Sequence, residues 1–460
     1  MLKVPKGATL VIGLGASGKA ICRHLARNGT AFLAADTRQV PPGVDEFRAA
    51  FPEVTLHCGP LTALDMSEAA EIVVSPGVDL NTPGLAEMRG RLRPDGAPLI
   101  VGEIALFVRA AQAPVAAVTG SNAKSTVTTL LGDMAVAAGR RVAVGGNLGT
   151  PALDLLADVP DVELFVLELS SFQLETTPRL GAESAAFLNL SEDHLDRHGD
   201  MAGYRDAKLG IFRGARHAVV NAEDPMTWPP EPLAAEDRFT TQEPHADEWG
   251  IAMHEGRDWL MHGGLPLLPA DEMGLAGRHN QANALAALAM GHHLGFALEA
   301  MCETLRRFKG LPHRSELVAE LDGVRWINDS KGTNVGATLA AIDGLGPTLG
   351  GRLVLLAGGV GKGADFTPLA APMARYGREA ILFGTDAEKL AAALQESVAV
   401  SRAADLEAAM ERAREIAEPG DCVLLSPACA SLDQFPSYIA RGEAYCRRVK
   451  QFVEEARHVD

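Results

Sequence analysis

Short aliphatic runs alternate with helical patterns through the first hundred residues of the chain. The aliphatic runs lie at residues 9–12, 31–35 and 72–74, and stretches with helical spacing separate them. This alternation is typical of a parallel sheet whose strands are joined by crossover helices. The pattern therefore predicts an α/β domain over these residues.

A second series of the same kind starts at Pro114. Residues 115–118 form an apolar run, and a helix that ends at Gly139 is predicted after it. The apolar face of this helix consists of Val127, Leu130, Leu131, Met134, Ala135 and Ala138. Unbroken apolar runs at residues 164–167 and 185–188 predict strands buried on both faces. Alternation around Glu255 and Gly256 predicts a hairpin peripheral to the main sheet.

A third series follows Pro312, with largely apolar runs at residues 324–327, 352–356, 380–383 and 422–425, each separated from the next by a helical stretch. A chain of 460 residues also exceeds what one hydrophobic core usually serves. We therefore predict three α/β domains, each built on a largely parallel sheet with flanking helices, over residues 1–102, 103–309 and 310–460. The first and third are expected to be Rossmann-like, and the central one is expected to be a P-loop domain.

Composition narrows the classes of function. With 47% hydrophobic and 22% charged residues, the chain has the composition of an ordinary globular protein. Its formal charge of −17 argues against nucleic acid or a membrane surface as partner, because both are polyanions. The six cysteines form no CxxC pair, and no apolar run approaches the roughly 18 residues of a membrane span. We therefore expect a cytoplasmic protein with reduced thiols and no stable membrane insertion.

The most informative segment is residues 119–126, Thr-Gly-Ser-Asn-Ala-Lys-Ser-Thr, between a predicted strand and a predicted helix. Backbone N–H groups at a helix start can hold phosphate oxygens, Lys124 can reach the outer phosphates, and the Ser125 hydroxyl can bind Mg²⁺. Ala123 occupies the usual glycine position before the lysine. Because a left-handed conformation would cost alanine roughly 1–2 kcal/mol, we predict negative φ at Ala123 and a helix that begins there. A turn with an exposed lysine is the alternative.

A second nucleotide-binding pattern lies near the start of the chain. Gly13, Gly15 and Gly18 form a complete GxGxxG after the first strand, and Asp36 ends the second strand. Alone, this pattern indicates a dinucleotide-dependent oxidoreductase. If ATP occupies the central domain, however, the first domain is free to hold the nucleotide handle of a substrate.

Two candidate metal ligands follow central strands. Glu168 ends the run at residues 164–167, and His194 comes shortly after the run at residues 185–188. Open α/β sheets bind ligands at the carboxyl ends of their strands, so the two side chains are expected to meet over the phosphates. A solvated or hydrogen-bonded role is the usual alternative for such residues, but their coincidence with a phosphate loop favours metal binding.

The ordered motifs resemble the Mur ligase family over essentially the whole chain, and in particular its D-glutamate-adding members. The segments that carry the resemblance are residues 120–126, 168–175, 192–197, 204–208, 279–285, 311–314, 328–331 and 426–435. Residues 36–38 (Asp-Thr-Arg) and 145–147 (Gly-Gly-Asn) favour this member over siblings that add L-alanine, a diamino acid or a dipeptide.

The resemblance implies roles position by position. The catalytic residues would be Lys124, Glu168, His194, Lys208 and Arg314. Two Mg²⁺ ions would be held by Ser125, Glu168, His194 and a carbamylated Lys208. ATP would contact Gly120, Ser121, Asn122, Ala123, Lys124, Ser125, Thr126, Asn280, Asn283, Arg314, Asp329 and Lys331. The UDP-linked substrate would contact Leu14, Ala16, Asp36, Thr37, Arg38, Ser75, Asn147 and Ser170. D-Glutamate would contact Lys362, Ser431, Leu432 and Tyr438.

The implied activity is ATP-dependent addition of D-glutamate to UDP-N-acetylmuramoyl-L-alanine through an acyl phosphate, a step of peptidoglycan synthesis that serves cell-wall biogenesis, cell shape and cell division. We expect a monomer that acts on small molecules. Ala123, Val360 and Tyr438 depart from the family pattern, which has glycine, aspartate and phenylalanine at these positions. Three alternatives stay open: a sibling such as an L-alanine-adding ligase or folylpolyglutamate synthase, a non-catalytic nucleotide sensor, and the oxidoreductase.

Overall fold

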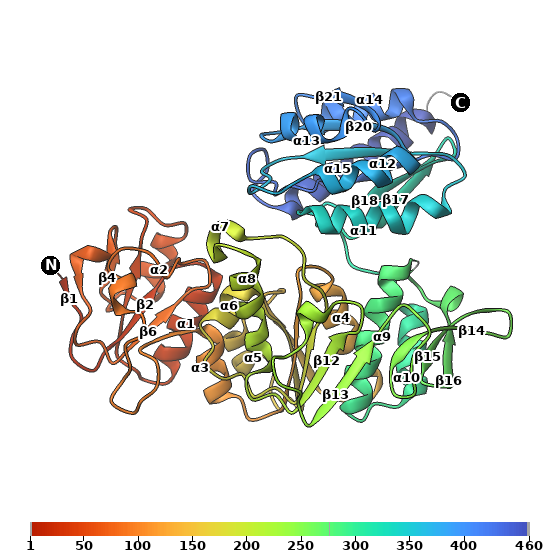
Figure 1. The fold of residues 1–460 in the computed structure, drawn as a ribbon. Helices are drawn as coiled ribbons and strands as arrows, with labels where there is room; N and C mark the ends of the chain where they lie inside the picture. The colour runs from red at the N-terminus through yellow and green to blue at the C-terminus, as the bar shows by residue number, and fades with distance from the viewer. Residues whose placement is uncertain (1, 276, 458–460) are drawn as a thin grey trace. The chain divides into compact units, whose positions relative to one another are not determined.

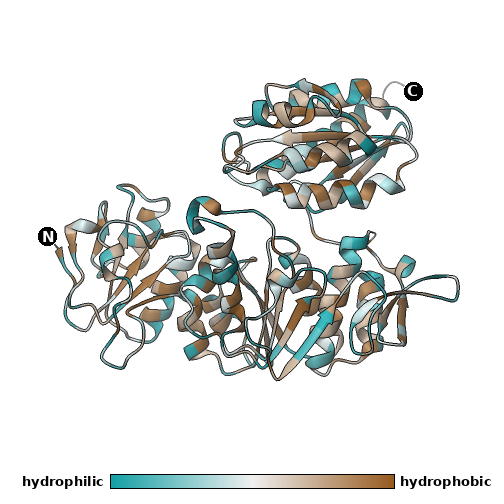
Figure 2. Cartoon of the chain, in the orientation of Figure 1, coloured by the Kyte–Doolittle hydropathy of each residue, from teal (hydrophilic) through white to brown (hydrophobic). Residues whose placement is uncertain are grey.

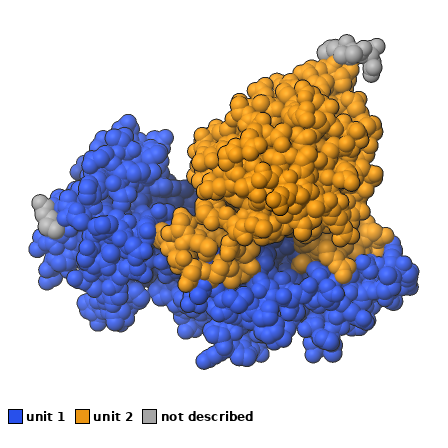
Figure 3. Space-filling view, turned by 45° about the horizontal axis from the view of Figure 1, so that its top comes forward, with its two compact units in different colours: residues 1–189, 202–267, 283–304 blue, residues 190–201, 268–282, 305–460 orange. Residues whose placement is uncertain are grey.

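The computed structural model describes residues 2–275 and 277–457, and in these residues it has a three-domain α/β fold (Figure 1). The residues cluster into two compact units, coloured in Figure 3. Unit 1 contains residues 1–189, 202–267 and 283–304, and unit 2 contains residues 190–201, 268–282 and 305–460. The first sheet and all of the central sheet except the last two residues of its edge strand lie in unit 1, and the third sheet lies in unit 2. The predicted boundaries near residues 103 and 310 stay predictions.

The first sheet confirms the parallel arrangement predicted from the aliphatic runs. Its strands lie in the order β4-β3-β2-β6-β7, and every neighbouring pair is parallel. The elements of this region are β1 (Leu2–Lys3), β2 (Thr9–Ile12), α1 (Ala16–Arg27), β3 (Phe32–Asp36), α2 (Val44–Ala50), β4 (Leu56–Cys58), β5 (Leu64–Asp65), β6 (Glu71–Val74) and β7 (Ile100–Gly102). Asp36 ends β3, as expected, at the carboxyl edge of the sheet.

The central sheet has the strand order β16-β15-β14-β13-β12-β11-β8-β10-β9. Its strands are β8 (Val115–Thr119), β9 (Val142–Gly146), β10 (Leu164–Glu168), β11 (Ser184–Phe187), β12 (His217–Asn221), β13 (Ala235–Phe239), β14 (Trp249–His254), β15 (Arg257–His262) and β16 (Leu265–Pro269). The longer helices around it are α3 (Glu103–Ala110), α4 (Lys124–Ala137), α5 (Ala152–Asp158), α8 (Met201–Leu209), α9 (Arg278–His293) and α10 (Leu298–Arg307), and the short α6 (Ser171–Glu175) and α7 (Leu195–His198) follow β10 and β11.

The predicted hairpin is present but is not separate from the main sheet. β14 and β15 pair antiparallel around Glu255 and Gly256, whose φ values of 52° and 80° are those of a tight turn with both central residues left-handed. β14 also pairs with β13 at Phe239 and Trp249, so the hairpin extends the edge of the central sheet. The prediction of a peripheral hairpin is confirmed, because β14 and β15, with β16 beyond them, form one edge of the sheet.

The third sheet has the order β17-β18-β22-β19-β20-β21, in which β17 is antiparallel to β18 and the other pairs are parallel. Its strands are β17 (Glu316–Leu321), β18 (Val324–Asn328), β19 (Leu353–Gly358), β20 (Gly377–Phe383), β21 (Ala399–Arg402) and β22 (Cys422–Leu425), and its helices are α11 (Val335–Leu345), α12 (Ala370–Tyr376), α13 (Ala387–Leu394), α14 (Leu406–Ile416) and α15 (Tyr438–Arg457).

Helices cover both faces of this third sheet, so its central strands β19 and β22 are apolar throughout. Along β19, Leu353 and Leu355 pack into one core while Val354 and Leu356 pack into the other. Figure 2 shows the result as hydrophobic strands between helices of mixed character. Continuous apolar runs are what such doubly covered strands require. None of the helices in residues 2–275 and 277–457 combines the length and apolar character needed to cross a bilayer.

Candidate active site

The candidate phosphate loop of unit 1 connects β8 to α4. Lys124 Nζ donates to the carbonyl oxygens of Gly120 at 2.9 Å and Ser121 at 3.0 Å, so its ammonium group lies against the loop backbone. Asn189, two residues after the end of β11, fixes the other side of the loop. Its side-chain oxygen accepts from Asn122 N at 2.8 Å, and its carbonyl accepts from Ser121 N at 2.9 Å. The sequence reasoning missed Asn189, although its place just beyond a central strand was a usable signal.

The prediction of negative φ at Ala123 was wrong. Ala123 has φ 65° and ψ −6°, and α4 begins one residue later, at Lys124. The turn between the loop and the first helical N–H groups needs a residue in the left-handed conformation. This conformation costs alanine roughly 1–2 kcal/mol, and the surrounding fold holds Ala123 in it despite that cost. Glycine, which the family usually has here, would avoid that cost.

Glu168 and Ser125, the candidate metal ligands of unit 1, are both buried. Glu168 is only 2% exposed at the end of β10, between β8 and β9. Its Oε1 accepts a hydrogen bond from Asn147 Nδ2 at 2.6 Å. Ser125 lies in the first turn of α4 and is 3% exposed. Carboxylate and hydroxyl oxygens are ligands that suit Mg²⁺, so these two residues fit the predicted ion.

Lys208 lies inside the protein and is not a solvent-exposed helical lysine. Its side chain is 1% exposed on α8, and Nζ donates to Gly120 O at 2.7 Å. The same nitrogen lies 4.7 Å from the centre of the Tyr204 ring, and the Tyr204 hydroxyl is 3.3 Å from Ser121 Oγ. Lys208 and Lys124 therefore bind one carbonyl oxygen of the phosphate loop. Carbamylation and metal binding by Lys208 stay predictions.

In the first domain, Asp36 organises the candidate UDP site. Its carboxylate accepts from Leu14 N at 2.9 Å and from Arg38 Nε and Nη2 at 2.8 and 2.7 Å. Burial alone would raise the pKa of Asp36, but the hydrogen bonds from Arg38 and from backbone N–H groups outweigh it and lower this pKa. Asp36 thus stays ionised and holds Arg38 at the carboxyl edge of β3. Thr37, between them, is exposed.

The glycines of the GxGxxG pattern permit close packing. A Cβ on Gly18 would lie 1.7 Å from Gly13 O, and one on Gly13 would lie 2.8 Å from Ser75 Cβ. Ser75 Oγ donates to Gly13 O at 3.3 Å, and Ala16 opens α1 beside this turn. The approach of α1 to the strand end therefore requires glycine at positions 13 and 18.

Ser170 has a structural role that the sequence reasoning did not identify. It is the N-cap of α6, where its side chain accepts from Gln173 N at 3.3 Å and its backbone N–H donates to Gln173 Oε1 at 2.9 Å. This capping box fixes the chain just beyond Glu168. Contact of Ser170 with the substrate stays a prediction.

In unit 2, Asp329 follows β18 and is buried. Its Oδ2 accepts from Ser426 Oγ at 2.7 Å, and its Oδ1 accepts from Ser315 N at 3.1 Å. Burial raises the pKa of Asp329 to about 6, against the opposing effect of these hydrogen bonds and of nearby arginines. Two residues on, Lys331 Nζ lies 3.9 Å from the centre of the Tyr438 ring, so tyrosine here still provides an aromatic face.

Lys362 forms an ion pair with a residue that the sequence reasoning did not single out. Asp193 Oδ1 lies 3.0 Å from Lys362 Nζ, and Asp193 Oδ2 lies 3.2 Å from Asn334 Nδ2 and 3.6 Å from His194 Nε2. Burial would raise the pKa of Asp193, but Lys362 and His194 lower it below its usual range. The expected D-glutamate and metal residues of unit 2, Lys362 and His194, therefore share one carboxylate.

The remaining expected site residues lie on loops and at the starts of helices, and Val360, which departs from the family pattern, lies on one of these loops. Val360 exchanges two backbone hydrogen bonds of 2.9 Å with Ala430, so valine at this position preserves the pairing. Ser431 is buried just beyond that pairing, whereas Leu432 is 72% exposed. Asn280 and Asn283 lie in the first two turns of α9, and Thr126 lies in the first turn of α4.

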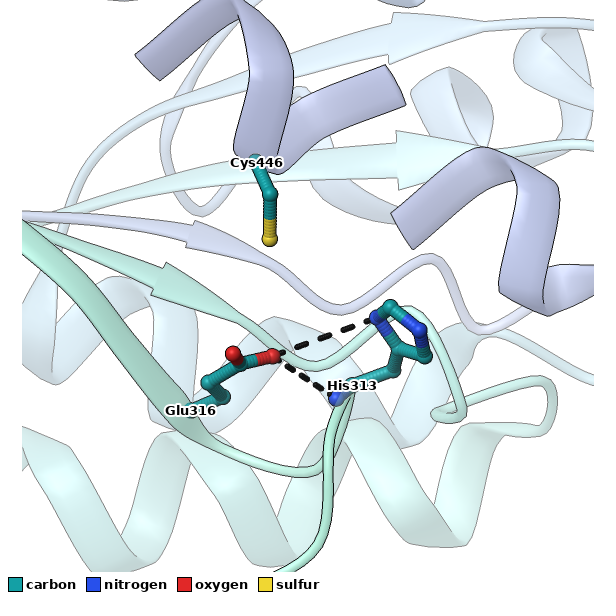
Figure 4. A group of neighbouring side chains, drawn as sticks. All are labelled: His313, Glu316 and Cys446. Carbon is teal, nitrogen blue, oxygen red and sulfur yellow. Dashed lines mark hydrogen bonds and ion pairs between the residues drawn. The ribbon is translucent and has the colours of Figure 1, made fainter. Parts of the chain in front are cut away.

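Arg314 follows a polar cluster of unit 2, drawn in Figure 4. Ligand atoms of His313, Glu316 and Cys446 lie within 4.8 Å of one another. Asn328 Nδ2 lies among them, 2.9 Å from His313 Nδ1, 3.3 Å from Glu316 Oε2 and 3.2 Å from Cys446 Sγ. The amide occupies the place that a cation would need, so this cluster is a hydrogen-bond centre that holds the loop before Arg314 against β18.

Comparison with known proteins agrees with this architecture. Family profiles match in three places: the Mur ligase MurD-like N-terminal domain over residues 7–91, the Mur ligase middle domain over residues 118–291, and the glutamate ligase domain over residues 313–429. A UDP-N-acetylmuramoylalanine–D-glutamate ligase of Chromohalobacter salexigens is 66% identical over 97% of both chains. One of Pseudomonas syringae pv. tomato is 52% identical over 96% of this chain and 97% of the relative. The chain therefore belongs to the Mur ligase family.

Solved structures of distant relatives share the fold. A MurF ligase of Thermotoga maritima in complex with ADP superposes with a TM-score of 0.63 at 17% identity, covering 92% of this chain and 96% of that one. The UDP-N-acetylmuramate–alanine ligase of the same organism gives a TM-score of 0.59 at 16% identity, covering 96% and 99%. At such identities the likeness supports the three-domain fold alone.

Proposed function

We propose that this protein is an ATP-dependent ligase that adds D-glutamate to UDP-N-acetylmuramoyl-L-alanine in peptidoglycan precursor synthesis. The observation that carries the proposal is the near-complete match, at 66% identity, to a relative named for this reaction. The geometry supports it, because Lys124 and the buried Lys208 both bind the Gly120 carbonyl of the phosphate loop. The cationic Lys124 at such a loop suits the transfer of a phosphoryl group, and the buried Lys208 beside it would become a metal ligand once carbamylated.

The chemistry requires activation, because a carboxylate has no leaving group suitable for attack by an amine. In the proposed sequence, the terminal carboxylate of the UDP-linked substrate attacks the γ-phosphorus of ATP, and ADP leaves with the electrons of the broken P–O bond. The D-glutamate amine then attacks the acyl phosphate carbon, and inorganic phosphate leaves. Lys124 and Arg314 would offset the negative charge on the transferred group, and His194, when it does not hold a metal ion, is a candidate to take the proton that the amine must lose.

We propose two Mg²⁺ ions as cofactors. Ser125 and Glu168 would hold the first ion, and His194 with a carbamylated Lys208 would hold the second. When bound, the ions would offset the charge of the phosphate oxygens. An unmodified ammonium beside a cation is repelled by it, whereas a lysine carbamate offers carboxylate oxygens, which is the reason to propose the modification.

The first domain would bind the UDP-linked substrate through the edge organised by Asp36 and Arg38. In unit 2, Lys362 and Ser431 would receive D-glutamate, and Asp329 would accept hydrogen bonds from the ATP ribose. All these residues come from a single chain, so we propose a monomer that acts on small molecules. Because ATP and UDP-linked precursors are cytoplasmic metabolites, the proposed location is the cytoplasm.

A substrate panel tests the proposal against its siblings. Purified protein with ATP, Mg²⁺ and UDP-N-acetylmuramoyl-L-alanine would be supplied with D-glutamate, L-glutamate, L-alanine or a diamino acid, and the products would be identified by mass spectrometry. We expect ADP and the D-glutamyl product with D-glutamate only. A preference for another amino acid would assign the protein to a sibling activity, and no ADP with any of them would favour the nucleotide sensor.

A further inference from the structure

A fully buried arginine lies at the start of α15 in unit 2. Arg441 is 0% exposed, and its guanidinium donates to neutral oxygens. Nε donates to Ser330 Oγ at 3.0 Å, Nη2 donates to Ser330 O at 2.9 Å, and both terminal nitrogens donate to Cys429 O at 3.2 Å. Burial lowers the pKa of Arg441 to about 10, which still leaves it a cation at neutral pH.

The oxygens that Arg441 binds belong to the ends of adjacent parallel strands. Ser330 follows β18, Cys429 follows β22, and Gly358, whose carbonyl lies 3.5 Å from Nη1, ends β19. These three strands are neighbours in the order β18-β22-β19. One guanidinium therefore joins three strands at the carboxyl edge of the sheet, the edge at which open α/β sheets bind ligands.

Each of these strand ends lies close in the sequence to residues that are expected to bind substrate. Ser330 lies between Asp329 and Lys331, and its hydroxyl also donates to Tyr438 O at 2.8 Å. Cys429 comes two residues before Ser431, and Gly358 comes four residues before Lys362. Through its hydrogen bonds, Arg441 thus connects the segment expected at ATP with the segments expected at D-glutamate.

Stability alone does not account for arginine at this place. Burying a cation against neutral oxygens is costly, and apolar side chains of similar volume often replace buried charges without loss of stability. What a guanidinium adds is a rigid planar set of five donors, which fixes the spacing of several acceptors at once. Lysine has the charge but lacks this planar geometry.

We propose that Arg441 is a positioning residue, which sets the spacing between the loops that bind ATP and the loops that bind D-glutamate. The inference rests on the proposed function. Reacting groups must be held within a few tenths of an ångström, and a displacement of about 1 Å can cost roughly 100-fold in rate. Loss of the guanidinium should therefore impair the use of D-glutamate and ATP, while the UDP-linked substrate, whose expected site lies in unit 1, should bind as before.

The test compares Arg441→Met, Arg441→Lys and the control Tyr445→Phe. Tyr445 lies one turn along the same helix, is equally buried, and donates to Val423 O within β22 at 3.1 Å, away from the strand ends. We expect Arg441→Met to lose roughly 100-fold in kcat/KM for D-glutamate, with the Kd of the UDP-linked substrate unchanged. Arg441→Lys should regain part of this loss, and Tyr445→Phe should behave like the wild type.

The outcomes separate this inference from the proposed function. If the wild type forms no ADP with D-glutamate, the proposed function fails. If the wild type is active and folded Arg441→Met keeps its kcat and KM for D-glutamate and ATP within about threefold, the positioning role is refuted. An equal loss for all three substrates in both Arg441 variants would also refute it, because that pattern indicates general unfolding. Should Arg441→Met fail to fold, the kinetic split in Arg441→Lys decides the question.

Discussion

Replacing Asp329 with asparagine should make the protein more stable and a poorer ligase. The carboxylate of Asp329 is buried beside Ser426 and Ser315, and burial raises its pKa from the ordinary value of 3.8 to about 6. Asparagine can keep both contacts. Its oxygen can accept from Ser315 N, and its amide can donate to Ser426 Oγ, whose own hydrogen can turn to Thr338 Oγ1 at 3.1 Å.

The size and the pH dependence follow from the raised pKa of Asp329. An acid whose pKa is raised on folding favours the folded state in its neutral form, so this contribution is full below pH 3.8 and is lost as the pH rises through about 6. The change from 3.8 to about 6 corresponds to about 3 kcal/mol in the free energy of unfolding. Asparagine stays neutral, so Asp329→Asn should be more stable than the wild type by up to about 3 kcal/mol at pH 8 and by almost nothing at pH 4.

Denaturant unfolding between pH 4 and pH 8 measures this difference. Asp421→Asn is a matched control for which the expected change in stability has the opposite sign. Burial would raise the pKa of Asp421, but the hydrogen bonds from Arg378 and from backbone N–H groups lower it. Asparagine at position 421 should therefore destabilise the protein at pH 8. The KM for ATP of Asp329→Asn should rise about tenfold or more, because a hydrogen bond to a charged group contributes roughly 1.5–3 kcal/mol. A variant no more stable than the wild type at pH 8, or equally stabilised at pH 4, would refute the reasoning.

Other substitutions test the phosphate loop and the first domain. Lys208→Ala should lose nearly all activity, and added short carboxylates should restore part of it; full activity without rescue would exclude a metal role for this buried lysine. Ala123→Gly should relieve the left-handed strain and stabilise the protein by up to about 1 kcal/mol in thermal unfolding, the relief being partly offset by the entropy of the unfolded chain, and a clear destabilisation would contradict this. Asp36→Asn should release Arg38 and raise the KM for the UDP-linked substrate with little change in kcat; a loss in kcat alone would speak against this binding role. Because the pKa of Asp36 is lowered on folding, its contribution to stability should be present above about pH 4 in the wild type and lost on acidification, whereas the variant should lack this dependence.

The strands could be predicted from the sequence because their burial leaves a local pattern. The run at residues 353–356 is wholly apolar because successive side chains enter two different cores. The hairpin at Glu255 and Gly256 could be predicted because polar and apolar residues alternate on both sides of its turn. The attachment of that hairpin to β13 has no such pattern. It depends on a single backbone pairing between Phe239 and Trp249, which no local spacing reveals.

The site residues that the sequence reasoning missed depend on contacts distant along the chain. Asn189 meets Asn122 because β11 lies beside β8, and Asp193 meets Lys362 across 169 positions. Arg441, in a segment rich in charged residues, has the local pattern of a solvent-exposed helical arginine although it is fully buried. At Ala123 local preference gave the wrong sign of φ, because the geometry of the loop overrides the preference of alanine.

Transfer of isotope from the substrate carboxylate tests the central claim most directly. UDP-N-acetylmuramoyl-L-alanine labelled with ¹⁸O in its carboxylate would be incubated with ATP, Mg²⁺ and D-glutamate, and the inorganic phosphate would be analysed by mass spectrometry. Activation as an acyl phosphate predicts one ¹⁸O atom in each phosphate released, together with one D-glutamyl product for each ADP. Unlabelled phosphate would contradict the account, because it would mean that ATP is hydrolysed by water and that the carboxylate is not phosphorylated.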